Sequence, residues 1–523
     1  MSGVRAAAGP GAPTRRAGAG ADSARIDPSF LALPLAELAG AALDRARRLG
    51  VGHAAVRVAR TRARRLLLHD GRLRGSQDTT ELGLSVGVLH GGARGFAAVP
   101  EVTPAAAASA AERAVAVARV CRAAGAEPVE LAPEPVHADR RWSSPCRIDP
   151  FAVPEPEAVA LLASWSRRLL AAPVVAHVLA KVSAVRETTW YADTAGTSVV
   201  QQRVRVHPQL LVVGAGPDGG SATLRTLGPP TARGWEYLAD SDGWDWAAEL
   251  AELPEHLAGK LRARPVRPGR YDLVMAPSHL WLTIHESVGH ATEADRALGH
   301  EISYAGGTFA TPADVGSLHY GSELMTVTAD RTDPHGLATV GYDDEGVAAG
   351  SWTLVRDGVL TGLQTDRHTA VRLGADRSTG CAYAESATHV PISRLPNVSL
   401  RPAPDGPDTA SLVSGVEDGI LLVGSDSWSI DTQRRRFQFT AQRAHRIRRG
   451  RLDGQLAGVA YQAGTTDFWG SLVAVGGPGT YHSFGADLCG KGQPVQAAAA
   501  SHGCPTAVFR GVRVVDTGAE GAR

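Results

Sequence analysis

From about residue 324 to its end, the chain consists of short apolar segments separated by glycine and Asp-Gly turns. Asp357-Gly358 and Asp453-Gly454 are two such turns. Asp-Gly between apolar segments is a strong signal for a tight hairpin, and closely spaced short strands are typical of antiparallel sheets. The apolar segments lie at 324–327, 351–355, 420–423, 437–441 and 512–515. The sequence therefore predicts a mainly antiparallel β domain over residues 266–523.

The first half of the chain has a different pattern, which predicts an α/β region over residues 27–265. Apolar residues recur at helical spacing over 35–49. Thr103-Pro104 opens an Ala-rich helix to about residue 123, with Thr103 as its cap, and a further helix is expected over 157–171. Strand-like segments lie at 53–58, 65–69, 82–99 and 178–213. Together the two halves predict an α+β fold.

Two segments of this first half are expected to stand apart from the fold. Residues 126–155 are rich in proline and polar residues, which predicts a linker. Residues 1–26 are rich in Ala, Gly and Pro, which predicts a disordered tail. Arg15-Arg16 lacks the apolar stretch of an export signal.

Composition excludes several classes of protein. With 54 Lys+Arg against 53 Asp+Glu, the net charge of +1 argues against a nucleic-acid-binding protein. No uninterrupted apolar run of about 18 residues is present, so no membrane association is expected. Five scattered cysteines do not form a disulfide framework, which favours a reducing, cytoplasmic location.

The segment with the clearest chemistry is HESVGH, which places His285, Glu286 and His290 within one short stretch. Neutral imidazoles are good zinc ligands, and a nearby glutamate can take a proton from metal-bound water. The two histidines are five positions apart, or about 140° around an ideal α-helix. Because both cannot then hold one ion, we predict a helix deformed at 288–290, for example by a π-bulge at Gly289.

A third ligand is needed, since catalytic zinc usually has three protein ligands and one open position. Candidates close in sequence are Glu293, Asp295 and His300. A distant candidate is Cys489, where Lys491 would favour the thiolate. A lone cysteine is also a common packing residue, so the residues alone leave the third ligand open.

The order of several segments reveals a family resemblance. HExxxH is preceded by PGRYDLVMAP at 268–277. It is followed by YDDEG at 342–346, VRDGVLTG at 355–362 and CGKGQPV at 489–495. In this order they resemble the TldD/PmbA family, specifically its catalytic TldD-type branch. The similarity is dense from about residue 266 onward. Where the family commonly has a glycine-rich acidic run after the second histidine, this chain has ATEAD.

The resemblance implies a zinc-dependent peptidase that acts on short or unfolded peptides. It implies Zn²⁺ ligands at His285, His290 and Cys489, and a general base at Glu286. It also implies a dimer, formed either with a PmbA/TldE-type subunit that lacks the metal motif or with a second copy of the chain.

Two alternatives remain from the residues themselves. The chain could be a non-catalytic peptide-binding or scaffold subunit, although such a subunit would have no need for Glu286. The basic run 434–436 could contact a carboxylate of a peptide, although a solvated strand face is the ordinary interpretation. The acidic residues at 343–345 precede Gly346 and are typical of a turn.

Overall fold

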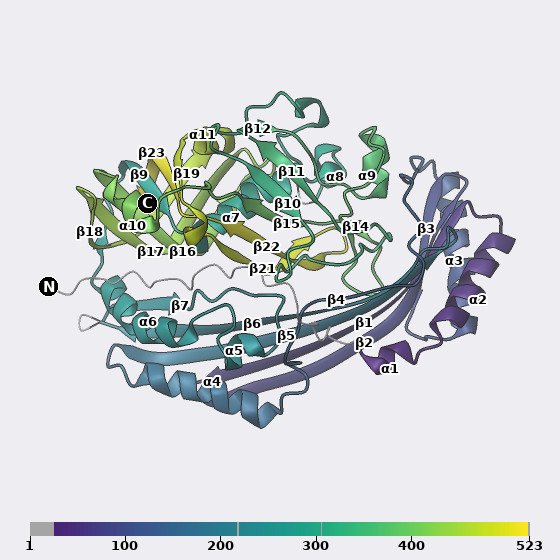
Figure 1. Cartoon of the computed structure of the whole chain (residues 1–523), viewed down its shortest axis with the longest axis horizontal. Coiled ribbons are helices and arrows are strands. Elements are labelled where there is room, and N and C mark those ends of the chain that lie inside the picture. Colours follow the sequence, from purple (N-terminus) through teal and green to yellow (C-terminus); the bar gives the residue numbers. More distant parts are fainter. Residues whose placement is uncertain (1–25, 217–218, 305, 521–523) are drawn as a thin grey trace.

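The computed structural model describes residues 26–216, 219–304 and 306–520. The predicted tail of residues 1–26 lies outside this part of the chain except for Ile26, which is buried in an apolar core. Among the described residues, no helix is long and apolar enough to cross a lipid bilayer. Helices combine with largely antiparallel sheets, so the α+β prediction is confirmed (Figure 1).

A seven-stranded sheet contains β1 to β7 of the first half, whereas β8 (Arg264–Pro265), at its very end, joins the sheet of the second half. The order of the seven-stranded sheet is β3-β2-β1-β5-β6-β4, with β7 paired to β6, and β4 runs parallel to β6. Asp70 and Gly71, with φ of 52° and 73°, form the turn with two positive φ angles that a tight hairpin favours. The strands are β1 (His53–His69), β2 (Arg72–His90), β3 (Ala93–Val99), β4 (Arg140–Ser143), β5 (Val175–Asp193), β6 (Ser198–Ala215) and β7 (Ser221–Arg225).

The long strands β1, β2, β5 and β6 form a curved platform beneath the second half of the chain (Figure 1). The sequence predicted two separate strands at 53–58 and 65–69, whereas β1 continues through both. Residues 126–155, predicted as a linker, contain β4, which joins the edge of this sheet.

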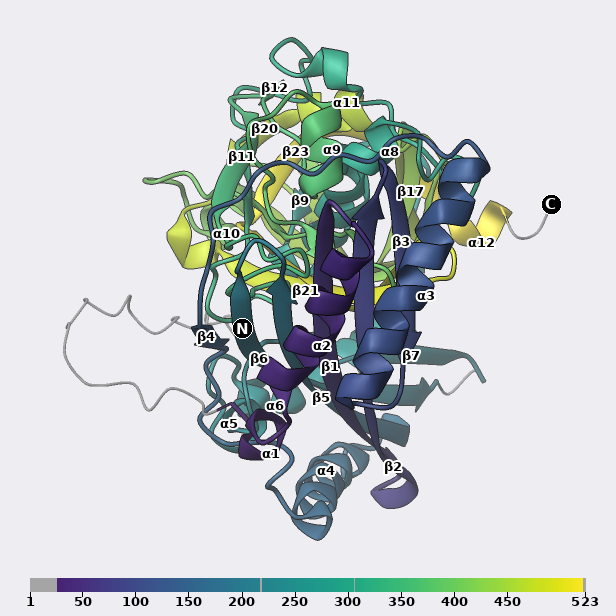
Figure 2. The same cartoon turned by 90° about the vertical axis from the view of Figure 1, so that its right-hand side faces the viewer.

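Helices cover the ends and the outer face of the platform (Figure 2). The predicted cap is confirmed, since Thr103 Oγ1 accepts a hydrogen bond from the backbone N–H of Ala106 at 3.2 Å. A Cβ on Gly95 of β3 would lie 1.9 Å from the Ala114 carbonyl oxygen, so this close helix–strand contact requires glycine. The helices are α1 (Pro28–Leu31), α2 (Leu35–Arg48), α3 (Pro104–Ala123), α4 (Glu155–Leu170), α5 (Glu236–Ala239) and α6 (Trp246–Leu261).

The second half is built around an eight-stranded sheet. Its order is β16-β9-β23-β19-β17-β18-β8, and β20 pairs with β23. Because β16 also pairs with β17, five of these strands close into a ring. The strands are β8 (Arg264–Pro265), β9 (Gly269–Met275), β16 (Asp418–Ile430), β17 (Arg436–Arg448), β18 (Arg451–Ala457), β19 (Val459–Gly464), β20 (Leu472–Val475) and β23 (Ala507–Asp516).

Smaller elements complete this half. β12-β11-β10-β15, β13-β14 and β21-β22 form three further sheets. Their strands are β10 (Val327–Asp330), β11 (Ser351–Arg356), β12 (Val359–Leu360), β13 (Ala382–Tyr383), β14 (Ile392–Ser393), β15 (Asn397–Leu400), β21 (His482–Lys491) and β22 (Gln496–Cys504). The helices are α7 (Pro277–Ile284), α8 (Ala294–Ala297), α9 (Arg367–Arg372), α10 (Thr409–Ser414), α11 (Thr465–Gly470) and α12 (Thr517–Glu520).

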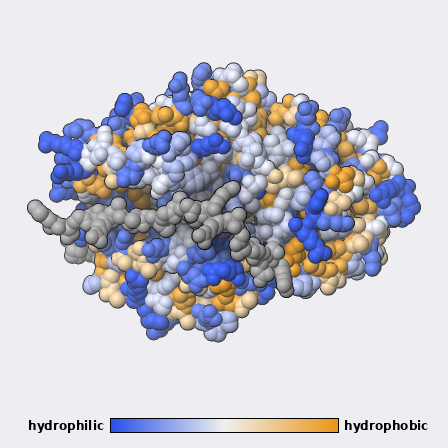
Figure 3. Space-filling view, in the orientation of Figure 1, coloured by the Kyte–Doolittle hydropathy of each residue, from blue (hydrophilic) through white to orange (hydrophobic). Residues whose placement is uncertain are grey.

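Ion pairs join the two halves. Arg57 of β1 lies 3.4 Å from Asp344, and Arg94 of β3 lies 3.1 Å from Glu345. Asp343 beside them accepts the backbone N–H groups of residues 345 and 347, so the predicted acidic turn is confirmed. Hydrophilic and hydrophobic residues are interspersed over the face shown in Figure 3.

Candidate metal centre

The HESVGH segment directly follows α7, which ends at Ile284, and departs from α-helical geometry. Residues His285–Gly289 form a π-helical turn, and His290–Thr292 a 3-10 turn. The backbone N–H of His290 donates to the carbonyl of His285, five residues earlier, which is the bond that defines a π-turn. The predicted deformation at 288–290 is confirmed, and it brings both imidazoles to the same side.

Cys489 lies against these imidazoles although it is 199 residues away from His290 in sequence. It sits on β21, where the register with β22 shifts between Ala486 and Cys489. Ligand atoms of His285, His290 and Cys489 all lie within 4.8 Å of one another, and all three side chains are buried. The Sγ of Cys489 is 3.2 Å from Nε2 of His290.

The hydrogen bonds of His285 fix which of its nitrogens is free to bind a metal. His502 lies 2.9 Å from the carbonyl of Val398 through Nδ1, and a carbonyl can only accept. Nδ1 of His502 therefore carries its proton. Burial lowers the pKa of His502 to about 4, so the ring is neutral and its Nε2 is an acceptor. That Nε2 is 2.6 Å from Nδ1 of His285, which must donate and leave the lone pair on Nε2.

The carboxylate of Glu293 likewise fixes which nitrogen of His290 is free to bind a metal. Nδ1 of His290 donates to Oε2 of Glu293 at 2.8 Å, so its Nε2 also carries the lone pair. Burial lowers the pKa of His290 to about 3 and holds the pKa of His285 well below its ordinary value. Both rings are therefore neutral near pH 7, which is the form that binds metal. This donor set fits a zinc ion.

The other local candidates for a third ligand lie elsewhere or are already engaged. Glu293 is fully buried and also contacts Arg296 at 2.7 Å and Lys491 at 2.9 Å. Asp295 contacts Lys491 at 2.8 Å. His300 stacks on His368 with ring centroids 6.1 Å apart. These contacts give Glu293 the role of a partner that orients His290.

The expectation that Lys491 favours the thiolate of Cys489 is wrong. Its ammonium group is taken up by Glu293, Asp295 and a backbone carbonyl. Burial raises the pKa of the Cys489 thiol, and the cations that oppose this rise are Arg394 and, more weakly, Arg296. Arg394, also buried, donates to the carbonyl of Cys489 itself. No local sequence signal marks His502, because it meets the site only through tertiary contacts. Arg394 lies in a segment, RLPN at 394–397, that resembles a family motif, but the segment does not show that Arg394 meets Cys489.

Glu286, which lines the same cavity as the two imidazoles, has an arginine as its partner. Its carboxylate forms an ion pair with Nη1 of Arg434. Burial raises the pKa of Glu286, and the neighbouring Arg434 opposes that rise. The basic run 434–436 was interpreted as solvated, and Arg434 departs from this because its side chain is only 12% exposed.

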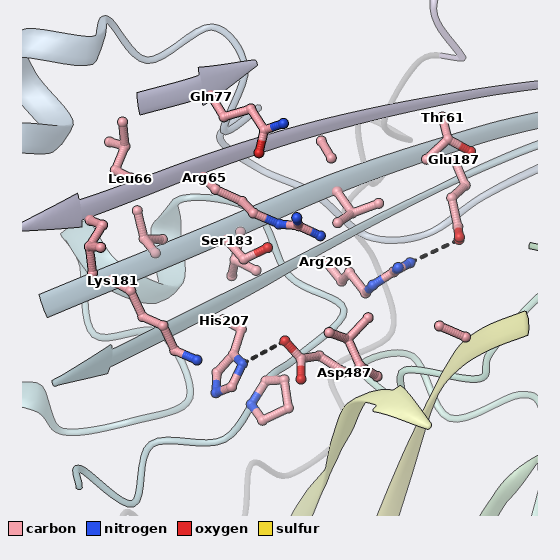
Figure 4. Close-up of a pocket in the computed structure, with 18 of the residues that line it drawn as sticks. Thr61, Arg65, Leu66, Gln77, Lys181, Ser183, Glu187, Arg205, His207 and Asp487 are labelled. Atoms are coloured by element: carbon pink, nitrogen blue, oxygen red, sulfur yellow. Dashed lines mark hydrogen bonds and ion pairs between the residues drawn. The ribbon is translucent and has the colours of Figure 1, made fainter. Parts of the chain in front are cut away.

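A cavity of about 800 Å³ contains Glu286 and the two imidazoles, with walls from both halves of the chain. Three large apolar side chains are exposed on these walls: Tyr304, Trp428 and Leu488. A second cavity of about 490 Å³ shares Lys181, His207 and Asp487 with it and continues along β1, β5 and β6. Figure 4 shows that second cavity, where His207 pairs with Asp487 and Arg205 with Glu187.

A buried His/His/Cys donor set in an α+β fold defines a candidate metalloprotein, and family models identify the family. Residues 268–516 match the PmbA/TldA metallopeptidase C-terminal domain, and residues 54–118 match PmbA/TldA metallopeptidase domain 1. The chain belongs to the PmbA/TldD family.

Individual relatives agree with this assignment. A metalloprotease of Methanothermobacter thermautotrophicus is 27% identical over 85% of this chain and 92% of its own length. A zinc metalloprotease TldD homolog of Saccharolobus solfataricus is 26% identical over 47% of this chain and 55% of its own length. TldE from Thermococcus kodakarensis has the same fold, with a TM-score of 0.68 at 16% identity over 90% of this chain and 98% of that one.

Proposed function

We propose that this chain is a zinc-dependent peptidase that hydrolyses short or unfolded peptides. The proposed ligands are His285, His290 and Cys489, and the proposed general base is Glu286. The observation that carries the proposal is the preorganised donor set. Two neutral imidazoles present their Nε2 lone pairs beside a buried thiol, and a carboxylate lies in the same cavity.

A zinc ion bound here would lower the pKa of a bound water and polarise a peptide carbonyl. The chain's own contribution is proton transfer and orientation. The carboxylate of Glu286 accepts a proton from the water that attacks the peptide carbonyl. It returns that proton to the amine nitrogen of the leaving peptide as the C–N bond breaks. Arg434 favours the ionised form of Glu286 that a base requires.

The surroundings of the site support confinement of the substrate. The cavity of about 800 Å³ has the size of a small-ligand site, so it has room for a short extended peptide and not for a folded protein. We infer that the chain works as a dimer, with itself or with a PmbA/TldE-type subunit. We also propose that residues 27–265 and 266–523 form two domains, the second of them catalytic. A cytoplasmic location rests on the cysteine count and stays a prediction.

Metal content measured by mass spectrometry tests the proposed ligands. We expect about one zinc per chain in the wild type and a large loss in Cys489→Ala. Cys504→Ala is the matched control, because Cys504 is equally buried but lies outside the ligand cluster. Full zinc in Cys489→Ala would show that the third ligand is another residue.

Metal content together with a peptide-cleavage assay separates the peptidase from a non-catalytic peptide-binding or scaffold subunit. A wild-type chain that neither contains zinc nor takes it up would favour the scaffold. A zinc-loaded chain that cleaves unfolded peptides would favour the peptidase.

A further inference from the structure

The three arginines of the 434–436 run do not share one environment. Arg435 and Arg436 are exposed, whereas Arg434 points into the cavity of the metal centre. The turn that separates them is held by Asp431, whose carboxylate accepts the backbone N–H groups of Gln433, Arg435 and Arg436. Arg434 has a φ of 60°, so its side chain leaves the turn in a direction different from those of its neighbours.

The guanidinium of Arg434 is only partly satisfied. A guanidinium has five N–H donors, and here Nη1 donates to Glu286. Its Nε is buried without an acceptor, which is costly for a charged group. A guanidinium binds a carboxylate best through two parallel N–H groups. The Nε/Nη2 edge of Arg434 therefore lacks the partner that suits it.

The carboxylates of the cavity are already engaged, so none of them supplies that partner. Asp426 lies 3.3 Å from Arg225, and Asp487 lies 2.8 Å from His207. Asp431 is taken up by its own turn. The free edge of the Arg434 guanidinium can therefore bind a carboxylate that a ligand brings into the cavity.

We propose that Arg434 is a substrate-binding residue that receives a carboxylate of the peptide, through the N–H groups that Glu286 does not use. The carboxylate is either the C-terminus of a short peptide or the side chain of Asp or Glu near the cleaved bond. This inference rests on the proposed function, because it identifies the class of peptide that the same cavity takes.

Calorimetric titration of the zinc-free chain tests the proposal without any hydrolysis. One pair of probes is N-acetyl-Ala-Ala-Ala and its C-terminal amide. The second pair is N-acetyl-Ala-Glu-Ala-amide and N-acetyl-Ala-Gln-Ala-amide. We expect a carboxylate to improve binding by about tenfold in at least one pair, and the pair that responds identifies the source of the carboxylate.

The variants separate Arg434 from its neighbours. Arg434→Asn removes the guanidinium while keeping a residue type that tolerates positive φ, and it should abolish the preference. Arg434→Lys should retain part of it, because the charge remains but the two-pronged contact does not. Arg435→Asn, in the exposed part of the run, should bind like the wild type.

Several outcomes would overturn the proposal. These are equal binding of carboxylate and amide probes by the wild type, no binding of any probe, or a preference that survives in Arg434→Asn. Circular dichroism confirms that each variant is folded. Failure of the proposed function would be seen separately, as a zinc-loaded chain that binds carboxylate peptides through Arg434 and does not cleave them.

Discussion

Two clusters in this molecule bring two imidazoles and a third ligand-type side chain close together, and they differ in every other respect. In each cluster the ligand atoms lie within 4.8 Å of one another. The first is buried in the second half of the chain, and the second is partly exposed at the turn between β1 and β2. The clusters are His285, His290 and Cys489, and His69, Asp70 and His177.

The difference lies in what the hydrogen bonds leave free. In the buried cluster, partners outside it take the Nδ1 atoms and leave Nε2 lone pairs facing one another. In the exposed cluster, both Nδ1 atoms face the same oxygen of Asp70, at 2.9 Å from His177 and 3.4 Å from His69. The other oxygen of Asp70 accepts the backbone N–H of Val178. Asp70 is thus a structural link between strands, and closeness of donors alone does not define a metal site.

The largest expected effect is the loss of hydrolysis in Glu286→Gln, a substitution at the buried cluster that should leave metal binding intact. Glu286→Gln removes the base but none of the proposed ligands, so zinc content should stay near one per chain. Hydrolysis of an unfolded peptide should fall by about 10²–10⁴-fold, the usual contribution of a general base. Asp70→Asn, the same kind of change in the exposed cluster, is the control and should leave the rate unchanged. Retained hydrolysis in Glu286→Gln would refute the assigned base.

A smaller effect is expected from the partner that orients His290. Glu293→Gln weakens the acceptor for Nδ1 of His290, so zinc affinity should fall by about 10–100-fold while the ligands remain. Competition with a chelator measures the change. His300→Gln controls for a nearby residue outside the site, and His177→Ala controls for the exposed cluster. If His177→Ala lowers the zinc content, the exposed cluster is a second metal site, and the hydrogen bonds to Asp70 do not prevent its histidines from binding metal.

Sequence predicted the local part of this site better than its distant part. The five-residue spacing of His285 and His290 required a deformed helix, because helix geometry alone fixes the angle between them. The place of Cys489 rested on a family resemblance, since its contact crosses 199 residues. His502 lies on β22 among small apolar residues, where only the packed structure shows that it faces His285.

In the fold, too, local features could be predicted from the sequence, whereas features that depend on distant contacts could not. Apolar periodicity predicts α2, and the Thr103 cap with its Ala-rich run predicts α3, because both signals are local. β1 was divided in two because its middle is rich in arginine. There Arg62 pairs with Asp78 of β2 at 2.8 Å, and Arg62 and Arg64 both lie over the ring of Phe151. Cross-strand partners therefore stabilise a segment that lacks the apolar alternation of a strand.

The smallest expected effect concerns the stability that Asp70 contributes. Burial raises the pKa of its carboxyl, but hydrogen bonds from Val178 and His177 outweigh it, so the folded pKa lies below the ordinary value of 3.8. The folded state thus favours the ionised form. This stabilisation is fully present above about pH 5 and is lost as the pH falls through the folded pKa.

Asp70→Asn should therefore lower the free energy of unfolding by at most about 1 kcal/mol near pH 7, because the pair is partly exposed. The difference from the wild type should shrink as the pH falls below about 4 and on through the folded pKa, because both chains carry a neutral side chain at this position once Asp70 is protonated. Urea unfolding at a series of pH values measures it. A difference in the free energy of unfolding that stays constant down to pH 3 would show that Asp70 stabilises the hairpin by its turn geometry rather than by its charge. In that case the imidazoles beside Asp70 would have no part in holding β1 to β5.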